Sequence, residues 1–303
     1  MTDQGTTVLD VALEAARRAG VALREGLAGA LAIEYKGAQG NDPVTEVDRR
    51  SEAIIAETIR ATFPGHRLLS EEGTTGGDDP DWRWIVDPLD GTINYAHGLP
   101  FSCISIAVEQ RGETVVGVVY NPLSEEMFCA RLGEGATLNG RPIKVSSTVE
   151  LRRALLSAAH GTWQANGRRF NRAATLGHVA QGLRDLGSAA LELCFVACGR
   201  LDGMAGATLN AWDVAAGALI VREAGGQITD ANGDPVAVDG RHFVVSNGRL
   251  HGAILARLHD DSAPVPPKAE EATKTAEETH SGALAAPTTN LSDQATAPPG
   301  AQL

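Results

Sequence analysis

The segment "WRWIVDPLDGTINYAHG", residues 82–98, constrains the fold more than any other part of the chain. An apolar, strand-like run ends there in two aspartates, Asp87 and Asp90, and a glycine and a threonine follow directly. Carboxylates clustered at the end of a buried strand repel one another and are costly to remove from water. The two acids therefore either cap a turn or share a positive ion between them.

Three further places carry acids that a fold alone does not require. They are the segment "DPVTEVD" (Asp42–Asp48), the pair Glu71-Glu72 after a short strand, and Asp213 at the start of a helix in "NAWDVAAGALIVREAGG". Each one alone fits a turn, a solvated pair or a helix cap. Together they offer hard oxygen ligands from several strand and helix ends, as Mg²⁺ requires. The combination indicates a magnesium site.

The turn "DPLDGT" adds the chemistry of a phosphate site. Asp87 and Asp90 straddle a turn stiffened by proline, so both carboxylates can face one point, with the Leu89 carbonyl as a further candidate ligand. A helix that begins at Gly91-Thr92 directs its N–H groups at whatever the metal holds, and a helix start favours phosphate. Gly91 also lets the backbone approach closely. Acid-bound metals beside such N–H groups predict a phosphoester hydrolase rather than a structural cation site.

The hydrophobic pattern predicts an α/β protein whose N-terminal half is α+β. Helices are expected over 8–27 and 49–63, joined by a loop over 32–43, and a short strand over 67–70. Strand-like runs separated by turns follow from Trp82 to Leu132 and predict an antiparallel meander. Strands then alternate with helices, of which those over 188–198 and 213–224 are the clearest.

The same pattern divides the chain into three parts. Residues 1–145 are expected to form a helix pair and a mostly antiparallel sheet that carries most metal ligands. Residues 146–258 form an α/β part with Asp213 and the substrate pocket. Residues 259–303 contain six of the fourteen prolines, no aromatic residue and a net charge of −5, a composition that predicts a disordered acidic tail.

Charge and hydropathy limit the partners of the protein. The formal net charge of −12 argues against a nucleic-acid or membrane binder, which needs a basic face. It permits a phosphorylated substrate, because a metal supplies the local positive charge. No apolar run approaches the roughly 18 residues that span a bilayer, and the first twenty residues lack a signal-peptide pattern. A cytoplasmic enzyme is expected.

Two long motifs, "WIVDPLDGTINYAHGLPF" and "WDVAAGALIVREAGG", occur in this order with Glu71 upstream. They resemble the signatures of the inositol monophosphatase family of magnesium-dependent, lithium-sensitive phosphatases, and the resemblance covers roughly Val8 to Leu258. It implies a layered αβαβα sandwich of the type shared with fructose-1,6-bisphosphatase. It also implies a homodimer.

The resemblance assigns roles to residues at the motif positions. It implies two or three Mg²⁺ ions per active site. The implied ligands of the first ion are Glu71, Asp87, the Leu89 carbonyl and Asp90. Those of the second ion are Asp87, Asp90 and Asp213. Thr92 orients the attacking water, with Asp48 as its hydrogen-bonded partner and Glu71 in support. The implied phosphate and substrate contacts are Lys36, the N–H groups of Gly91 and Thr92, and Gly187, Ser188 and Ala189.

The implied reaction is hydrolysis of a phosphate monoester by direct in-line attack of a metal-activated water, with myo-inositol 1-phosphate as the first expected substrate. Fructose 1,6-bisphosphate, histidinol phosphate, 3'-phosphoadenosine phosphate and a non-catalytic binding role remain alternatives. A haloacid-dehalogenase-type phosphatase is a disfavoured rival, because its two acids are separated by one residue and those of "DPLDGT" by two.

One position departs from the family pattern. Gly206 stands where the inositol enzymes often carry a glutamate that binds ring hydroxyls. A glycine cannot supply that acceptor, so the sequence predicts broad use of polyol phosphates. Asp202 and Asn210 are the nearest polar side chains in sequence that could replace it.

Overall fold

The computed structural model describes residues 7–28, 33–36, 42–73, 75–158, 162–165, 168–207, 209–235 and 242–260. These residues belong to one compact unit. The predicted tail lies outside the described residues from position 261 onward. The predicted division at residue 145 falls between the last strand of one sheet and the first strand of the next.

Two helices lead the chain, α1 (Val8–Leu27) and α2 (Glu46–Thr62). The helix predicted over 8–27 is confirmed. The second begins three residues earlier than predicted, because Thr45 and Asp48 form a capping box at its start. The loop predicted over 32–43 is wrong in part, since the strands β1 (Ile33–Lys36) and β2 (Asp42–Thr45) pair there as an antiparallel hairpin. Residues 33–36 (IEYK) alternate between apolar and polar side chains over only four residues, and Pro43 lies within the partner strand, so the sequence signal for this hairpin is weak.

Within the described residues, eight strands form a large sheet in the order β10-β9-β8-β7-β6-β5-β3-β4. All neighbours run antiparallel except β3 and β5, so the predicted meander is confirmed. The bounds are β3 (Arg67–Ser70), β4 (Thr75–Gly76), β5 (Trp82–Asp90), β6 (Cys103–Gln110), β7 (Glu113–Asn121), β8 (Glu126–Arg131), β9 (Gly135–Leu138) and β10 (Arg141–Pro142).

A second sheet has five strands in the part of the chain that the structure describes, in the order β14-β11-β15-β17-β16. Strand β11 runs parallel to β14 and β15, and β17 runs antiparallel to β15 and β16. The bounds are β11 (Leu155–Ala158), β14 (Gly182–Arg184), β15 (Gly203–Ala207), β16 (Gln227–Asp230) and β17 (His242–Ser246).

Helices and one hairpin complete the second half. The helices predicted over 188–198 and 213–224 are α5 (Ala189–Ala197) and α6 (Ala211–Glu223), and Gly225, with φ +86°, follows the C-cap of α6. The other elements of this half are the 3₁₀ turn η1 (Leu151–Arg153), the strands β12 (Thr162–Ala165) and β13 (Arg168–Asn171), α4 (Arg172–Gly177) and α7 (His251–Leu258). The short helix α3 (Thr92–Ala96) lies in the first half, between β5 and β6.

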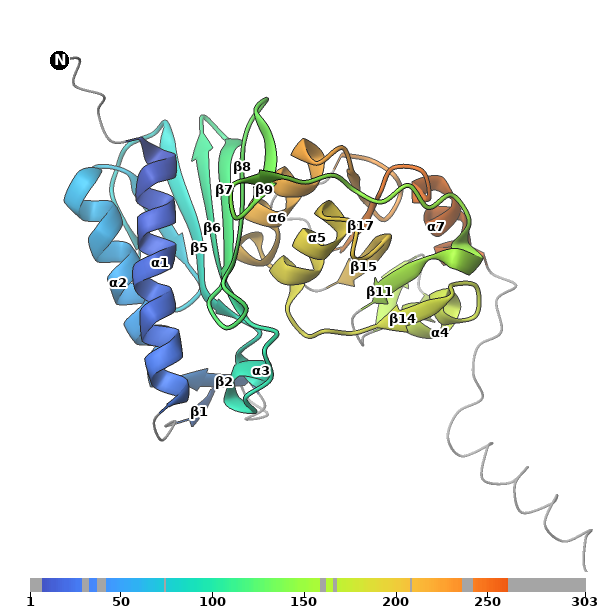
Figure 1. Cartoon of the computed structure of the whole chain (residues 1–303), viewed down its shortest axis with the longest axis horizontal. Coiled ribbons are helices and arrows are strands. Elements are labelled where there is room, and N and C mark those ends of the chain that lie inside the picture. The colour runs from blue at the N-terminus through green and yellow to red at the C-terminus, as the bar shows by residue number, and fades with distance from the viewer. Residues whose placement is uncertain are drawn as a thin grey trace, which may run out of the picture. The chain divides into compact units, whose positions relative to one another are not determined.

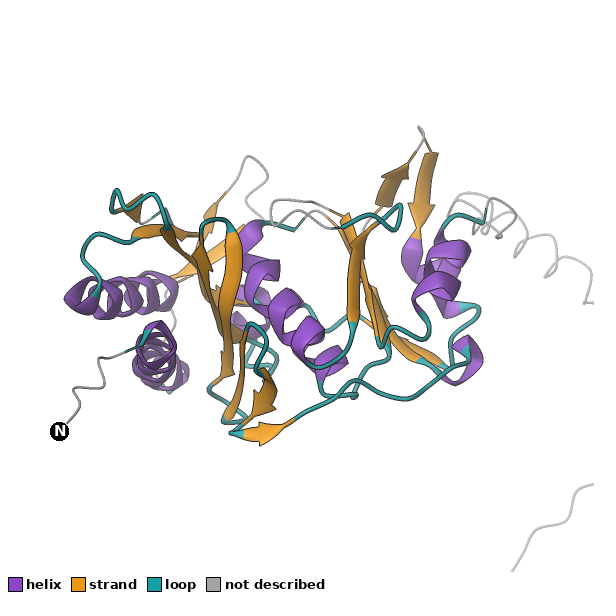
Figure 2. Ribbon diagram, turned by 90° about the horizontal axis from the view of Figure 1, so that it is seen from above, coloured by secondary structure: helices purple, strands orange, loops and turns teal. Residues whose placement is uncertain are grey.

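Side chains that alternate along the strands bind these elements into five layers (Figures 1 and 2). Trp84 packs with α1 and α2, whereas its neighbour Ile85 packs with α5 and α6. In the second sheet Val245 faces α5 and α6, and Val244 faces α4 and α7. The αβαβα sandwich is therefore confirmed. None of the helices in the described ranges has the length and apolar character to cross a bilayer.

An aromatic cluster closes the end of the large sheet where β3 and β5 begin. The His66 ring stacks on Phe63 and Trp82, with centroids 4.6 Å and 5.2 Å away, and its Nδ1 accepts a hydrogen bond from Trp84 Nε1 at 3.0 Å. Burial lowers the pKa of His66, and the charge of Asp79 partly opposes this. The cluster therefore favours the neutral imidazole, whose Nδ1 can accept.

This cluster should make stability depend on pH. The unfolded chain binds the His66 proton more readily than the folded protein, so the stabilisation is complete above about pH 6.5 and declines as the pH falls below it. His66→Gln retains an acceptor for Trp84 but does not titrate. Urea unfolding at pH 7.5 and 5.5 should show a smaller loss for this variant than for wild type. Equal losses would contradict this role for His66.

Candidate active site

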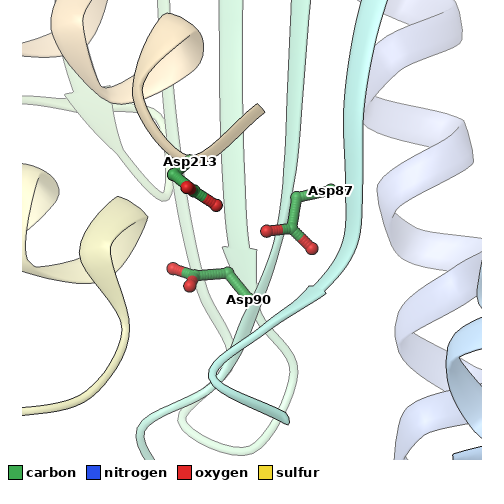
Figure 3. A group of neighbouring side chains, drawn as sticks. All are labelled: Asp87, Asp90 and Asp213. Atoms are coloured by element: carbon green, nitrogen blue, oxygen red, sulfur yellow. The ribbon is translucent and has the colours of Figure 1, made fainter. Parts of the chain in front are cut away.

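Asp87, Asp90 and Asp213 converge on one point (Figure 3). One carboxylate oxygen from each lies within 4.8 Å of the other two. Asp87 and Asp90 come from the end of β5, and Asp213 comes from the first turn of α6. Asp87 is 1% exposed and Asp90 is 9% exposed. None of the ion pairs in the described ranges involves these three residues.

The electrostatics of this cluster call for a cation. Burial and then the charges of Glu71, Asp90 and Asp213 raise the pKa of Asp87 well above its usual value. Burial and the charge of Asp90 raise the pKa of Asp213 to about 7. Burial also raises the pKa of Asp90. A hard divalent cation would remove this repulsion, and carboxylate oxygens are the ligands it prefers, so the donor set fits Mg²⁺.

A bulge in β5 places Asp87 and Asp90 on the same side. Asp87 pairs with Ser105 of β6 and Asp90 pairs with Cys103, so β5 has one more residue than β6 over this stretch. In a regular strand, residues three apart point to opposite faces, and the extra residue corrects this. Ser51 Oγ on α2 donates to the Pro88 carbonyl at 2.8 Å, which holds the bulge against the helix layer.

Asp213 is held by its own helix and by β6. Asp213 is not the N-cap that its position suggested. Asn210 is the N-cap, and Asp213 is the third helical residue of a capping box, in which one of its carboxylate oxygens accepts the Asn210 N–H at 2.7 Å. Ser105 Oγ donates to the Trp212 carbonyl at 3.0 Å. Because Ser105 is the strand partner of Asp87, this single hydroxyl fixes the start of α6 relative to the end of β5.

Glu71 reaches the same place from β3. Strand β3 runs parallel to β5, with Ser70 beside Val86, so the following Glu71 lies level with Asp87. Although Glu71 is exposed, its carboxyl group shares a hydrogen bond with Asp87. Desolvation of that group, together with the charges of Asp213, Glu72 and Asp90, raises the pKa of Glu71 to about 7.

Thr92 and Asp48 form a second polar pair beside the cluster. Thr92 Oγ1 lies 3.2 Å from Asp48 Oδ1 and 3.0 Å from the Leu89 carbonyl, with its single proton available to either. The other Asp48 oxygen accepts the N–H and the hydroxyl of Thr45. Desolvation raises the pKa of Asp48, while these hydrogen bonds lower it. The α2 cap thereby fixes the carboxylate that faces Thr92.

Gly91 begins α3 in a conformation that favours glycine, with φ +85°. A Cβ atom there would lie 2.7 Å from the Phe101 carbonyl oxygen and 3.2 Å from that of Gly187. A larger residue would therefore separate the turn from the segment that precedes α5. The sequence predicted that another group comes close to the backbone at Gly91. In the structure, the backbone carbonyls of Phe101 and Gly187 come close to it.

The predicted substrate residues are partly brought together. Ser188 is buried, and its Oγ donates to Asp90 Oδ2 at 2.7 Å. Gly187 precedes it with φ +72°, and Ala189 begins α5. Lys36 lies in β1, and its side chain is outside the described residues.

Several residues that position the aspartates were not predicted from the sequence. Ser51 and Ser105 are described above, and Asp90 Oδ2 also accepts the Ala190 N–H at 2.8 Å and lies 3.7 Å from Cys103 Sγ. Most act across strand and helix contacts between distant segments, and the sequence carried no local signal for them. Asp202 is engaged elsewhere by Ser146 Oγ and the Leu155 N–H, so it does not replace the acceptor lost at Gly206.

Comparison with known proteins agrees with this geometry. The sequence model of the inositol monophosphatase family matches residues 4–263. The chain belongs to the inositol monophosphatase family.

Its relatives include inositol monophosphatases and Nus factors named SuhB. It is 43% identical to inositol monophosphatase 3 of Solanum lycopersicum over 83% of this chain and 96% of that protein. It is 39% identical to Nus factor SuhB of Escherichia coli K12 over 84% and 96%. The structure of an inositol monophosphatase from Anabaena superposes with a TM-score of 0.74 at 39% identity, covering 86% of this chain and 97% of that one.

Repulsion in the cluster predicts an unusual stability profile. The raised pKa values of Asp213 and Glu71, about 7, mean that metal-free protein loses stability as the pH rises through 7. Asp87→Asn removes one charge, so in EDTA at pH 8 its melting temperature should exceed that of wild type by about 2–4 °C per kcal/mol of repulsion relieved.

Added Mg²⁺ should reverse this order. Mg²⁺ should raise the melting temperature of wild type far more than that of Asp87→Asn, as differential scanning calorimetry would show. An Asp87→Asn protein that melts below wild type in EDTA and gains as much from Mg²⁺ would contradict the assignment of Asp87 to a cation site.

Proposed function

We propose that this protein hydrolyses the phosphate monoester of a small polyol or sugar, with Mg²⁺ as its cofactor. The observation that carries the proposal is the group of three convergent, largely buried aspartates, whose repulsion a cation would relieve. Family membership supports the same conclusion, because the family is a metal-dependent phosphatase family that acts on small phosphorylated substrates. We assign the enzyme to the inositol-phosphate phosphatases.

The proposed metal ligands are those expected from the sequence. Glu71, Asp87, the Leu89 carbonyl and Asp90 would hold one ion, and Asp87, Asp90 and Asp213 a second, for two or three Mg²⁺ ions in all. When bound, these ions supply the positive charge that activates water and neutralises phosphoryl oxygens.

The side chains of this chain then place the reactants. Thr92 Oγ1 donates its proton to Asp48 Oδ1, which leaves its lone pairs to accept a hydrogen bond from the attacking water. Glu71 offers a second acceptor to the same water. The N–H groups of Gly91 and Thr92, with Lys36, bind the phosphate, and the segment Gly187–Ala189 lines the pocket for the alcohol. The water oxygen bonds to phosphorus in line as the bond to the alcohol oxygen breaks. One proton of the water ends on the alcohol oxygen and the other stays with phosphate, so the products are the alcohol and inorganic phosphate.

Myo-inositol 1-phosphate is the proposed first substrate, supported by the names of the plant and cyanobacterial relatives. Fructose 1,6-bisphosphate, histidinol phosphate and 3'-phosphoadenosine phosphate are alternatives for the same chemistry. By family resemblance we also propose sensitivity to Li⁺, a homodimer and a cytoplasmic location. A regulatory binding role is a second candidate, favoured by the similarity to Nus factor SuhB. The presence of every expected acid supports catalysis.

Catalysis should depend on Asp90. Asp90→Asn removes a charge from a residue proposed to bind both ions, yet its amide oxygen can still accept from Ser188 and Ala190, so the fold should persist. Phosphate release in Mg²⁺ should fall by several orders of magnitude, and EDTA should abolish activity in wild type. Near-normal turnover of Asp90→Asn, or wild-type turnover in EDTA, would refute the proposed function.

Phe243 explains how the chain accommodates Gly206. The two residues are partners across β15 and β17. A Cβ atom at Gly206 would lie 2.5 Å from Phe243 Cζ, and the ring is fully buried. Gly206 shares a strand face with Met204, which packs toward α5 and α6. The ring thus occupies the space into which a larger side chain at 206 would point.

A paired substitution therefore tests selectivity. Gly206→Glu alone should lower the melting temperature through overpacking. Gly206→Glu with Phe243→Val has room for the carboxylate and should raise the kcat/KM ratio of inositol 1-phosphate over glycerol 2-phosphate by about ten- to a hundred-fold relative to Phe243→Val alone. The same ratio in the double and single variants would show that position 206 does not face the substrate.

A further inference from the structure

Glu192 is a buried glutamate for which the proposed reaction has no role. It lies on α5 and is 2% exposed. One carboxylate oxygen accepts the Leu186 N–H at 2.7 Å, and the other accepts the Ser157 hydroxyl from β11. Burial raises the pKa of Glu192 to about 7, while these two hydrogen bonds lower it. Both donors therefore favour the charged carboxylate.

Both backbone polar groups of Leu186 are hydrogen-bonded to side chains. Its N–H donates to Glu192, and its carbonyl accepts from Asn94 Nδ2 at 2.6 Å. Asn94, on α3, also donates to the Phe101 carbonyl at 2.8 Å. The backbone at Leu186 is thus held between α5 and α3, directly before Gly187 and Ser188.

The chain continues from Leu186 to the two groups that donate hydrogen bonds to the Asp90 carboxylate. Ser188 Oγ and the Ala190 N–H both donate to Asp90 Oδ2, at 2.7 Å and 2.8 Å. Gly187 permits the sharp turn between them and Leu186, with φ +72°. A shift of Leu186 would therefore move the groups that fix the Asp90 carboxylate.

We propose that Glu192 is a positioning residue that sets the metal affinity of the site by holding the Leu186–Ser188 segment against Asp90. The proposal rests on the proposed function for the identity of the cation. It concerns how tightly the cation binds, and it leaves the ligand set unchanged. Partners that orient metal ligands typically change metal affinity or activity by about 10–100-fold when removed.

Asp202 provides a matched control. It is also buried, and it also accepts one serine hydroxyl, from Ser146, and one backbone N–H, from Leu155. Its contacts do not include Asp90 or the segment before α5. Leucine at either position leaves the same kinds of donor unsatisfied, so both variants should lose stability to a similar extent.

The experiment measures Mg²⁺ binding directly by isothermal titration calorimetry, together with the Mg²⁺ dependence of phosphate release. Glu192→Leu should weaken Mg²⁺ binding by about tenfold or more. Glu192→Gln, which keeps an acceptor for Leu186, should stay within about threefold of wild type. Asp202→Leu should melt at a lower temperature and bind Mg²⁺ as wild type does.

A milder variant keeps the test decisive if Glu192→Leu does not fold. Ser157→Ala removes one of the two donors to Glu192 and should weaken Mg²⁺ binding by less than tenfold but measurably. Wild-type Mg²⁺ affinity in Glu192→Leu, or in Ser157→Ala where Glu192→Leu does not fold, would overturn the proposal, and so would equal weakening in Asp202→Leu. Absence of Mg²⁺-dependent hydrolysis in wild type would instead refute the proposed function, and the calorimetry would still compare the variants.

Discussion

Repulsion among the buried carboxylates of Asp87, Asp90 and Asp213 is the interaction on which the rest of the site depends. Their oxygens lie within 4.8 Å of one another with raised pKa values. Left alone, such a group would separate or take up protons. The surrounding fold instead holds each carboxylate in place. A bound cation would relieve the repulsion among them, and this relief would contribute to the free energy of cation binding. This repulsion lowers the stability of the metal-free protein at the place where the proposed chemistry requires the carboxylates.

The layers of the sandwich supply that restraint. The β5 bulge is fixed by Ser51 from the α1–α2 layer, and the start of α6 is fixed by Ser105 from within the sheet. Parallel pairing of β3 with β5 brings Glu71 level with Asp87. Residues from the helix layer on one side, the sheet, and the helix layer on the other thus meet at one end of β5, and removing any layer would release a carboxylate.

The pocket side of the site shows how a departure from the family pattern is accommodated. A glycine at position 206 would leave a void in a packed interior, and voids are costly. The Phe243 ring fills that space and is fully buried. Gly206 and Phe243 therefore pack as a pair across β15 and β17.

The sequence by itself determined the fold class, the meander, the clearest helices and the acids that approach one another. It could do so because apolar periodicity and turn residues act over short stretches of chain, and because the motifs around Asp87 and Asp213 are long. It placed the start of α2 late and missed the β1–β2 hairpin, where capping and backbone pairing decide the structure. Only the tertiary structure decided that a bulge aligns Asp87 with Asp90, that Ser105 of β6 binds the Trp212 carbonyl at the start of α6, and that Glu192 binds the Leu186 N–H. Ser105 and Trp212 are 107 positions apart in the chain. The bulge depends on the pairing of β5 with β6, and Glu192 receives its second donor from Ser157 on β11. The partners that decide these features come from other segments, so no local sequence pattern predicts them.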